Sequence, residues 1–541
     1  MGKTLAIKGL GGFHLICDAL NDKAVKELRR KKQRDSKPFA VMFKDLNTVN
    51  EYCYLTEEEI KEITSWRRPV LILGQKKEMV AGINNGLNTT GAVLPYMPIH
   101  YLMFKVLKTP AVVLTSGNMS EEPIIIDDAI AEREFAGIAD ALISYNRKIV
   151  NRTDDSVVRI IDHRPSIIRR SRGYVPRPVD LRWNAEGILA LGAEQKNSFC
   201  IGKGNQAILS QYIGDIKNKP TYDFLKEAID RFSILFRFKT LYLACDLHPD
   251  YLSTQYAELL REKLEIPLFR VQHHHAHIAS CMAEHGLDEP VIGISFDGTG
   301  FGTDGTLWGG EFLVAELRDF IRYSFFDPVP LPGGEKAIHE PWRTACSYLI
   351  KYLGRDFDLT SVPALRKVGE SKLKSIGEML SGNVHSPLSS GAGRLFDAVA
   401  ALLGLCTHET FDSEAPVRLE SAIRDKTEEF YPFTAGKPVI FKDTFIAIIQ
   451  ELQDKSPSLI AAKFHNTIAR VILEVSEQIR RETSLNKVVL SGGVFQNKYL
   501  LERSLDLLRL NRFLVFTSNT VPSNDGGISL GQLIIASKSI V

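Results

Sequence analysis

The densest group of reactive side chains lies in the stretch Val271-Gln272-His273-His274-His275-Ala276-His277, which holds four of the 13 histidines of the chain. If the stretch continues into a helix, His273 and His277 stand one turn apart on one face, about 6 Å from each other. Two imidazoles at this spacing suit a shared metal ion. Two histidines at this spacing, taken alone, are explained equally well by a solvated or hydrogen-bonded histidine cluster. The density of the run favours a metal site.

Several apolar runs lead into glycine and acidic residues. Leu243–Cys245 ends at Asp246, Val291–Phe296 runs into Asp297-Gly298-Thr299-Gly300, Val488–Leu490 enters Ser491-Gly492-Gly493, and Val521-Pro522 enters Ser523-Asn524-Asp525-Gly526. A glycine amide can approach an anion closely, while a carboxylate at a strand end is held in place. These turns are therefore expected to carry the chemistry of the second part of the chain.

A basic segment near the N-terminus has a more specific pattern than an ordinary run of charged residues. Lys32-x-Arg34-x-x-Lys37-Pro38 places three cations where a predicted helix, beginning at Asn21-Asp22 and running through Arg34, gives way to a strand. There the cations could converge on a polyphosphate. A solvated helix face is the alternative explanation.

The surrounding pattern predicts an α/β or α+β module. Thr56 with Glu59 forms a capping box that opens one helix, and another spans about Asp127–Phe135. The remaining apolar runs predict strands at 38–43, 69–73, 111–115 and 157–161. From about 183 onward, strands that end in glycine or an acid alternate with longer helices, which is typical of α/β folding.

Length and composition indicate a soluble protein of two or three domains. The chain has 541 residues, 67 Lys+Arg against 65 Asp+Glu, and no apolar run as long as a membrane helix or a secretory signal. A net charge of +2 gives no general reason to expect a membrane or nucleic-acid partner. Seven scattered cysteines without a Cys-x-x-Cys argue against disulfides and a thiolate zinc site. We expect a cytoplasmic protein.

The first module resembles the YrdC family, which makes acyl-adenylates from ATP. The resemblance rests on the Lys-x-Arg…Lys-Pro element and on Ser116-Gly117-Asn118, which directly follows an apolar strand and which alone would predict only a β-turn. It implies that the catalytic and nucleotide-binding residues are Lys32, Arg34, Lys37, Ser116 and Asn118. Ser156 and the arginines of Arg169-Arg170-Ser171-Arg172-Gly173 resemble the remaining nucleotide-side elements of the family, and of these arginines Arg170 is assigned to nucleotide binding.

The second module resembles the sugar kinase, Hsp70 and actin superfamily, and within it the branch that transfers carbamoyl and threonylcarbamoyl groups. The fold class implied is an α/β YrdC-like domain followed by a duplicated α/β domain of that superfamily. The resemblance implies four metal ligands, namely His273, His277, Asp297 and Asp525. Two imidazoles with two carboxylates suit zinc, iron(II) or manganese, and the order of metal affinities alone does not choose among them. We expect zinc or iron. It further implies nucleotide-binding residues at Lys196, Gly298, Thr299, Asp397, Gly492, Gly493 and Asn497.

The order of the modules resembles the HypF family of carbamoyltransferases, which acts in NiFe-hydrogenase maturation. The resemblance implies a domain at 1–182 that forms carbamoyl-adenylate from ATP, with Mg²⁺, and a carbamoyl phosphate-derived carbamate. A domain at 183–541 would then transfer the carbamoyl group to the C-terminal cysteine of HypE, for synthesis of the cyanide ligand. Full-length relatives begin with an acylphosphatase-like domain and a Cys-x-x-Cys region, and this sequence contains neither, so we expect a shortened or reduced relative.

Two other functions stay open at this point. A fused tRNA threonylcarbamoyladenosine synthase would use related modules, but a tRNA partner normally leaves a basic face that the charge balance does not indicate. A nucleotide-dependent maturation scaffold or chaperone is the second alternative, because the superfamily of the second module includes Hsp70. That alternative leaves the Lys-x-Arg…Ser-x-Asn set without a role.

Overall fold

A computed structural model describes residues 2–118, 122–382 and 384–540. Met1 and Val541, the outer ends of the two predicted domains, lie outside them. The fold is mixed α/β, with two compact units. Unit 1 comprises Met1–Cys245, Asp250–Phe269 and Asn519–Leu533, and unit 2 comprises Asp246–Pro249, Arg270–Ser518 and Ile534–Val541. Among the described residues, none of the helices combines the length and the apolar character that a membrane crossing requires.

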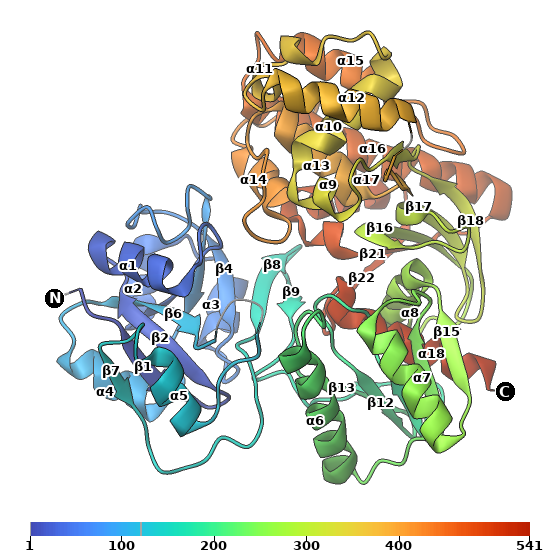
Figure 1. Cartoon of the computed structure of the whole chain (residues 1–541). Helices are drawn as coiled ribbons and strands as arrows, with labels where there is room; N and C mark the ends of the chain where they lie inside the picture. The colour runs from blue at the N-terminus through green and yellow to red at the C-terminus, as the bar shows by residue number, and fades with distance from the viewer. Residues whose placement is uncertain (1, 119–121, 383, 541) are drawn as a thin grey trace. The chain divides into compact units, whose positions relative to one another are not determined.

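Unit 1 contains a nine-stranded sheet (Figure 1), and Ser116 is the last residue of its strand β6. Its strand order is β7-β1-β2-β6-β3-β5-β4-β8-β9, with parallel and antiparallel neighbours mixed. The strands are β1 (Leu5–Lys8), β2 (Phe13–Asp18), β3 (Ala40–Phe43), β4 (Val70–Gly74), β5 (Thr89–Val93), β6 (Ala111–Ser116), β7 (Ala141–Ile143), β8 (Val157–Ile161) and β9 (Arg164–Arg169). The helices are α1 (Asp22–Lys32), α2 (Leu46–Tyr52), α3 (Glu57–Thr64), α4 (Pro98–Val106) and α5 (Asp128–Phe135).

The predicted caps of the first helices are confirmed, with one change at the end of α1. Asn21 caps α1 by accepting from the Ala24 amide, and Thr56 with Glu59 forms the capping box of α3. The helix ends at Lys32, however, and does not run through Arg34 as expected, because Gln33 adopts a left-handed conformation with φ 50°. This turn closes the helix and sends the chain toward β3.

A six-stranded sheet follows, in the order β10-β13-β12-β11-β14-β15. Its strands are β10 (Val179–Asp180), β11 (Ile188–Ala190), β12 (Cys200–Lys203), β13 (Gln206–Leu209), β14 (Tyr242–Asp246) and β15 (Leu268–Val271). Two long helices accompany it, α6 (Lys219–Phe236) and α7 (Leu252–Leu264). Apolar side chains of both helices bury against the strands, including Phe224, Leu225 and Ala257. As expected, β14 is a buried strand that ends at Asp246.

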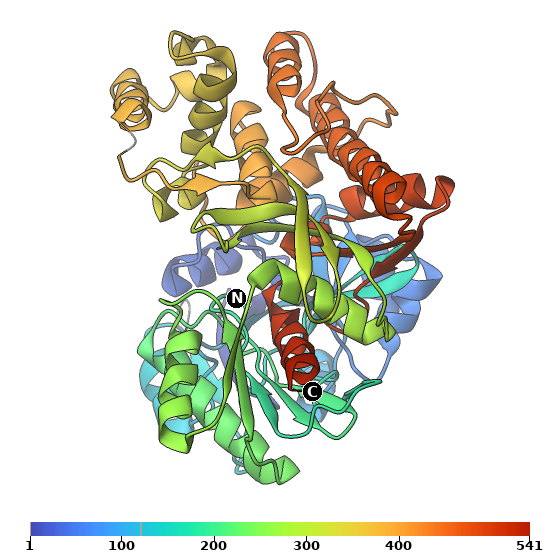
Figure 2. The same ribbon diagram turned by 90° about the vertical axis from the view of Figure 1, so that its right-hand side faces the viewer.

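A seven-stranded sheet forms the centre of unit 2. Its order is β19-β20-β17-β16-β21-β22, and β18 pairs with β17. The strands are β16 (Val291–Phe301), β17 (Leu307–Ala315), β18 (Phe320–Phe325), β19 (Val329–Pro330), β20 (Leu388–Ser389), β21 (Lys487–Ser491) and β22 (Leu514–Thr517). Helix α8 (His273–His285) packs against β16, β17 and β21, whereas α13 (Ala392–Leu402) and α16 (Pro457–Thr483) lie across the other face of the sheet (Figures 1 and 2).

The remaining helices follow in the chain, and several of them pack around α13 and α16. They are α9 (Glu335–His339), α10 (Pro341–Leu353), α11 (Pro363–Arg366), α12 (Glu370–Gly382), α14 (Glu414–Ala422), α15 (Lys442–Glu451), α17 (Lys498–Leu510) and α18 (Ile528–Ser539), with short 3-10 turns η1 (Leu359–Ser361), η2 (Gly493–Gln496) and η3 (Asp525–Gly527). Helix α10 packs on α13, and α17 packs on α16.

Two predicted strand ends differ from the structure. The run at 291–296 was expected to end before Asp297, but β16 continues to Phe301, and its pairing with β17 shifts register between Phe296 and Gly300. Such an irregularity lets a strand redirect side chains without ending. Val521-Pro522 is not a strand, since the last strand is β22. Proline lacks the amide hydrogen that a ladder needs.

Candidate functional site

The histidine run forms the first turns of α8, as the spacing predicted. Gln272 caps the helix because its Oε1 accepts from the His275 amide at 2.9 Å. His273 and His277 are almost completely buried, and their ring centroids lie 5.0 Å apart. The helix therefore presents both imidazoles on one face.

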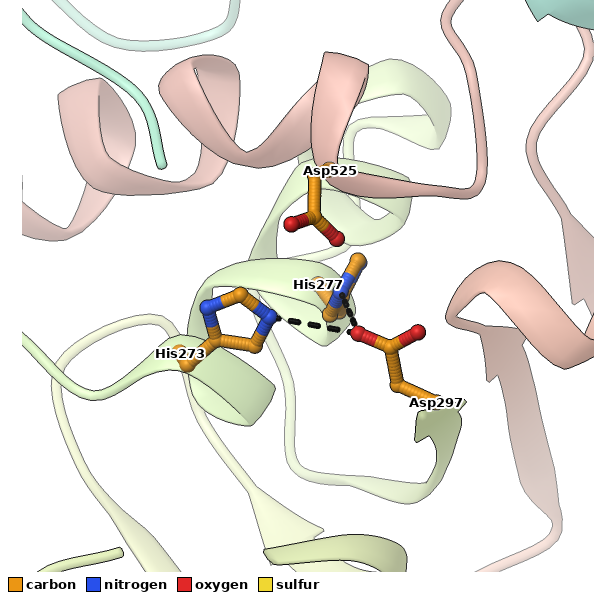
Figure 3. Close-up of side chains that lie close together, drawn as sticks. All are labelled: His273, His277, Asp297 and Asp525. Carbon is orange, nitrogen blue, oxygen red and sulfur yellow. Dashed lines mark hydrogen bonds and ion pairs between the residues drawn. The ribbon is translucent and has the colours of Figure 1, made fainter. Parts of the chain in front are cut away.

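Both imidazoles converge on one carboxylate. His273 Nε2 lies 3.3 Å and His277 Nε2 lies 3.4 Å from Asp297 Oδ2. Ligand atoms of His273, His277, Asp297 and Asp525 all lie within 4.8 Å of one another, and their side chains turn toward a common point (Figure 3). The structure thus brings together the four side chains predicted as metal ligands, whose N2O2 chemistry fits a borderline divalent cation.

A second carboxylate, Asp246, orients the first histidine. Its Oδ2 lies 2.8 Å from His273 Nδ1, and both side chains are fully buried. Because a carboxylate accepts the Nδ1 proton, the lone pair of neutral His273 lies on Nε2 and faces the Asp297 oxygen. Two acceptor atoms in such proximity require a cation, either a proton or a metal ion. Sequence reasoning placed Asp246 at a strand end without giving it this role.

The two histidines, His273 and His277, lower the pKa of Asp297. Burial alone raises the pKa of Asp297, but when His273 and His277 are protonated, their hydrogen bonds and positive charge outweigh burial and hold this pKa well below its usual range. The carboxylate is therefore ionised at neutral pH and available as an anionic ligand.

Gly300 allows the histidines to pack against β16. A Cβ atom at this position would lie 2.6 Å from His274 Cε1 and 2.8 Å from His273 Cδ2. Contacts this short do not occur in folded proteins, so the absence of a side chain here sets how closely α8 approaches the strand. Of the other two histidines, His275 Nε2 lies 2.6 Å from the Glu316 carbonyl, and burial holds the pKa of His274 well below its usual value.

Four of the predicted nucleotide-binding residues of unit 2 lie in a strand or in a turn after a strand. Gly298 and Thr299 are half-buried within β16. Gly492, with φ 107°, precedes Gly493 at the start of η2, and a Cβ on Gly492 would lie 2.2 Å from the Phe296 carbonyl oxygen. Only glycine tolerates both this dihedral angle and this close approach to β16.

Asn497 is held by its neighbours rather than directed outward. Its Oδ1 caps α17 by accepting from the Leu500 amide at 3.0 Å. Its Nδ2 lies 2.8 Å from His465 Nε2, while His465 Nδ1 lies 2.7 Å from the Ala461 carbonyl. The carbonyl fixes the proton of His465 on Nδ1, so Nε2 accepts from Asn497. Burial lowers the pKa of His465 to about 4, which keeps this ring neutral.

Asp397 lies on α13 in a buried cluster of charged groups. Its Oδ2 lies 3.1 Å from Arg394 Nη2, and both side chains are buried. Burial raises the pKa of Asp397 to about 6, against the opposing effect of Arg394. Burial and the nearby Asp397 raise the pKa of Glu409 to about 8. Sequence reasoning did not single out Arg394 or Glu409, because spacing alone cannot reveal which charges share a buried space.

In unit 1, the Lys-x-Arg and Ser-x-Asn elements meet. Lys32 Nζ donates to the Ser116 carbonyl at 2.5 Å, to the Asn118 carbonyl at 3.0 Å and to Asn118 Oδ1 at 2.9 Å. Ser116 Oγ donates to the same Asn118 Oδ1 at 2.8 Å. Lys32 is 4% exposed. Burial lowers the pKa of Lys32 to about 7, with Arg34 and Lys37 contributing and Asp154 opposing.

The other two cations of the basic motif adjoin this cluster. Arg34 donates to the Lys37 carbonyl at 3.1 Å, to the Pro38 carbonyl at 2.5 Å and to Thr115 Oγ1 at 3.3 Å. Burial lowers the pKa of Arg34 to about 9, assisted by Arg29 and Arg169. The Lys37 side chain is exposed. The motif therefore combines a buried lysine, a half-buried arginine and an exposed lysine.

Three further predicted residues of unit 1 make mainly internal contacts. Ser156 Oγ donates to the Arg172 carbonyl at 2.9 Å and accepts from the Ser171 amide at 2.8 Å. Arg170 donates to the Thr520 carbonyl at 3.1 Å and to the Arg177 carbonyl at 2.6 Å. The Lys196 amide donates to Asp215 Oδ1 at 2.7 Å. Near the basic motif, it is Arg169 whose positive charge lowers the pKa of Arg34 and opposes the rise that burial causes in the pKa of half-buried Asp154.

Family models match almost the whole chain. The Sua5, YciO and YrdC model, described as "Telomere recombination", matches residues 1–171. A "HypF Kae1-like domain" model matches residues 184–284. The model "Carbamoyltransferase, Kae1-like Domain, second subdomain" matches residues 293–532.

Individual relatives match over the same length. Carbamoyltransferase HypF of Synechocystis sp. is 39% identical, with 99% of this chain and 71% of that protein aligned. Carbamoyltransferase HypF of Rhizobium leguminosarum bv. viciae is 36% identical over 100% of this chain and 71% of its own. A crystal structure of full-length HypF in the phosphate- and nucleotide-bound form superposes with a TM-score of 0.96, at 44% identity, over 100% of this chain and 71% of that chain.

Proposed function

Because the chain belongs to the HypF family of carbamoyltransferases, we propose that it activates a carbamate with ATP and passes the carbamoyl group to the C-terminal cysteine of HypE. In this proposal the module at 1–182 carries out the first step, and the module at 183–541 carries out the second. In the first, an oxygen of the carbamoyl phosphate-derived carbamate attacks the α-phosphorus of ATP and pyrophosphate leaves. In the second, the cysteine thiolate attacks the carbamoyl carbon and AMP leaves. The product serves cyanide ligand synthesis in NiFe-hydrogenase maturation.

The cations of the first module suit the adenylation step. Lys32 holds the strand end at Ser116 and Asn118 through three hydrogen bonds, so the loop that follows β6 is tied to the end of α1. Arg34 and Lys37 add positive charge beside it, where charge on the triphosphate develops as pyrophosphate departs. The residues proposed for this step are Lys32, Arg34, Lys37, Ser116 and Asn118, with Mg²⁺ accompanying ATP.

The observation that carries the second step is the convergence of His273 Nε2 and His277 Nε2 on Asp297 Oδ2, at 3.3 and 3.4 Å. With Asp525 they form the ligand set for one zinc or iron ion. When bound, that ion supplies Lewis-acid polarisation of the mixed anhydride. Asp246 keeps the His273 lone pair directed at the ligand cluster. The nucleotide is assigned to Gly298, Thr299, Gly492 and Gly493 on the family resemblance.

The test is His273→Ala or His277→Ala with three measurements on each protein. Metal content should fall sharply, and thiocarbamate should no longer form on the cysteine of HypE, because one of four ligands is missing. ATP–pyrophosphate exchange should persist, since the Lys32 cluster contains neither histidine. His163→Ala, at an exposed histidine, is the control. A His273→Ala protein that keeps its metal and transfers normally would refute the assignment.

A further inference from the structure

The end of strand β9 holds the loop that carries the predicted metal ligand Asp525. Asn524, which directly precedes that ligand, donates from Nδ2 to the Ile168 carbonyl at 3.0 Å, across 356 positions of the chain. Earlier in the loop, the Thr520 carbonyl accepts from Arg170 Nε at 3.1 Å. These residues all belong to unit 1, so both hydrogen bonds form inside one compact unit. The last strand of the nine-stranded sheet and the residue after it therefore anchor the loop at two points.

Asn524 also shapes the turn on which Asp525 lies. Its Oδ1 accepts from the Gly526 amide at 2.9 Å, and its carbonyl accepts from the Gly527 amide at 2.9 Å. The residue is 2% exposed. Asparagine can shape the turn and reach β9 at once, because its side-chain amide accepts through one atom and donates through the other. One buried side chain thus forms η3 and connects it to β9.

Asp525 has less local support than the other predicted ligands. His273 and His277 lie on a helix of 13 residues and Asp297 lies within a strand of 11 residues, whereas Asp525 lies on a 3-10 turn of three residues. A turn this short has few hydrogen bonds of its own, so its position depends on the contacts around it. The hydrogen bonds of Asn524, the preceding residue, are contacts of this kind.

Metal binding is sensitive to the position of the Asp525 carboxylate. Its ligand atom and those of the other three residues lie within 4.8 Å of one another (Figure 3). A zinc-like cation holds nitrogen and oxygen ligands at about 2.0–2.2 Å, so a carboxylate displaced by about 1 Å no longer completes the set. Outer residues that orient a ligand typically change metal affinity about 10- to 100-fold. A side chain that fixes η3 therefore has a measurable effect on the metal.

We propose that Asn524 is a positioning residue of the metal site, which holds Asp525 toward the ion by fixing η3 to the Ile168 carbonyl. The strand that ends the first sheet then contributes to metal affinity in the second module. Arg170, for which the family resemblance implies nucleotide binding, supports the same loop through Thr520. The assignment rests on the proposed function, because Asp525 needs this fixed position only as a metal ligand.

The test removes the hydrogen bond to Ile168 and keeps the turn. Asn524→Asp retains an oxygen for the Gly526 amide but cannot donate, and Asn524→Ser keeps a capping oxygen on a side chain too short to reach β9. The full chain is loaded with Co²⁺, whose visible absorption reports the geometry of its ligands. Competition with a chelator should show Co²⁺ affinity reduced about tenfold or more in both variants. The spectrum should move toward that of Asp525→Ala, which lacks this ligand.

Two controls separate positioning from general destabilisation. ATP–pyrophosphate exchange should stay at the wild-type rate in both variants, because Asn524 is not part of the Lys32 cluster. Asn218→Ser changes another capping asparagine, at the start of α6, and should leave the Co²⁺ affinity and spectrum unchanged.

Other outcomes would separate this assignment from the proposed function. Wild-type Co²⁺ affinity and spectrum in either Asn524 variant would overturn the assignment alone, even with a lower free energy of unfolding, because Asn524 would then serve only the stability of the loop. An equal loss of Co²⁺ affinity in Asn218→Ser would overturn it as well. An Asp525→Ala protein that binds Co²⁺ as the wild type does would instead overturn the ligand set of the proposed function.

Discussion

Asp246 and His273 are 27 positions apart in the sequence, yet the carboxylate lies 2.8 Å from the imidazole Nδ1 with both side chains fully buried. The last residue of β14 thereby fixes the tautomer of the first residue of α8. Histidines that bind metals are commonly oriented by such an outer carboxylate, which also makes the ring a better ligand.

Asp246→Asn should therefore weaken the metal site without removing a ligand. The amide can still accept from Nδ1 but carries no charge, so we expect metal affinity to fall about 10- to 100-fold. Competition with a chelator of known affinity measures the change. Asp356→Asn, at an exposed acid, should have no effect. Equal metal affinity in the two variants would show that Asp246 serves only packing.

Gly300→Ala should displace the histidines of α8. The new methyl group would lie 2.6 Å from His274 Cε1 and 2.8 Å from His273 Cδ2, in a packed interior where a shift typically costs about 1–3 kcal/mol. Both the free energy of unfolding and the metal content should decrease. Gly377→Ala in α12 is the control, because a Cβ there meets no atom within 4 Å. Normal metal content in Gly300→Ala would mean that α8 can move without disturbing the site.

Lys32→Ala and Arg34→Ala should each slow ATP–pyrophosphate exchange by about 100-fold. Lys32→Ala releases Ser116 and Asn118, which the lysine holds through three hydrogen bonds, and Arg34→Ala removes positive charge beside the proposed triphosphate. A 100-fold loss corresponds to a few kcal/mol of transition-state stabilisation. Metal content should not change, because neither side chain belongs to the histidine cluster. Lys26→Ala, on the exposed side of α1, provides the control. If ATP–pyrophosphate exchange is as fast in both variants as in the wild type, the basic motif is only a solvated helix face.

The stability of the protein should depend on pH through Lys32. Burial lowers the pKa of Lys32 to about 7, below the 10.5 of an ordinary lysine. Between these values the unfolded chain binds more protons than the folded one, so stability rises with pH in this window and is lost as pH falls toward 7. The slope attributable to Lys32 is at most about 1.4 kcal/mol per pH unit.

Denaturant titrations from pH 7.5 to 9.5 on the wild type and Lys32→Met measure this contribution. The difference in unfolding free energy between the two proteins should grow in favour of the wild type as the pH rises. Lys26→Met should reproduce the wild-type slope, because Lys26 is exposed. Parallel curves for the wild type and Lys32→Met would show that Lys32 keeps an ordinary pKa in the folded protein.

Local patterns in the sequence determine much of this protein. The capping residues Asn21 and Thr56, and the four-residue spacing of His273 and His277, are set by interactions within a few positions, so the helices they begin or occupy could be predicted. The motifs also predicted the α/β class and the family, because ordered sets of rare residues are informative without coordinates.

Only the tertiary structure decided which distant groups meet. Asp246 at His273 Nδ1, Gly300 beneath the two rings and Arg394 beside Gly298 are brought together from separate strands and helices, and spacing along the chain carries no information on such contacts. The same holds for Asp297, which was expected after a strand end but lies inside β16, where the pairing with β17 shifts register. Strand length depends on the neighbouring strand that supplies the hydrogen bonds, so the sequence of one segment could not predict it.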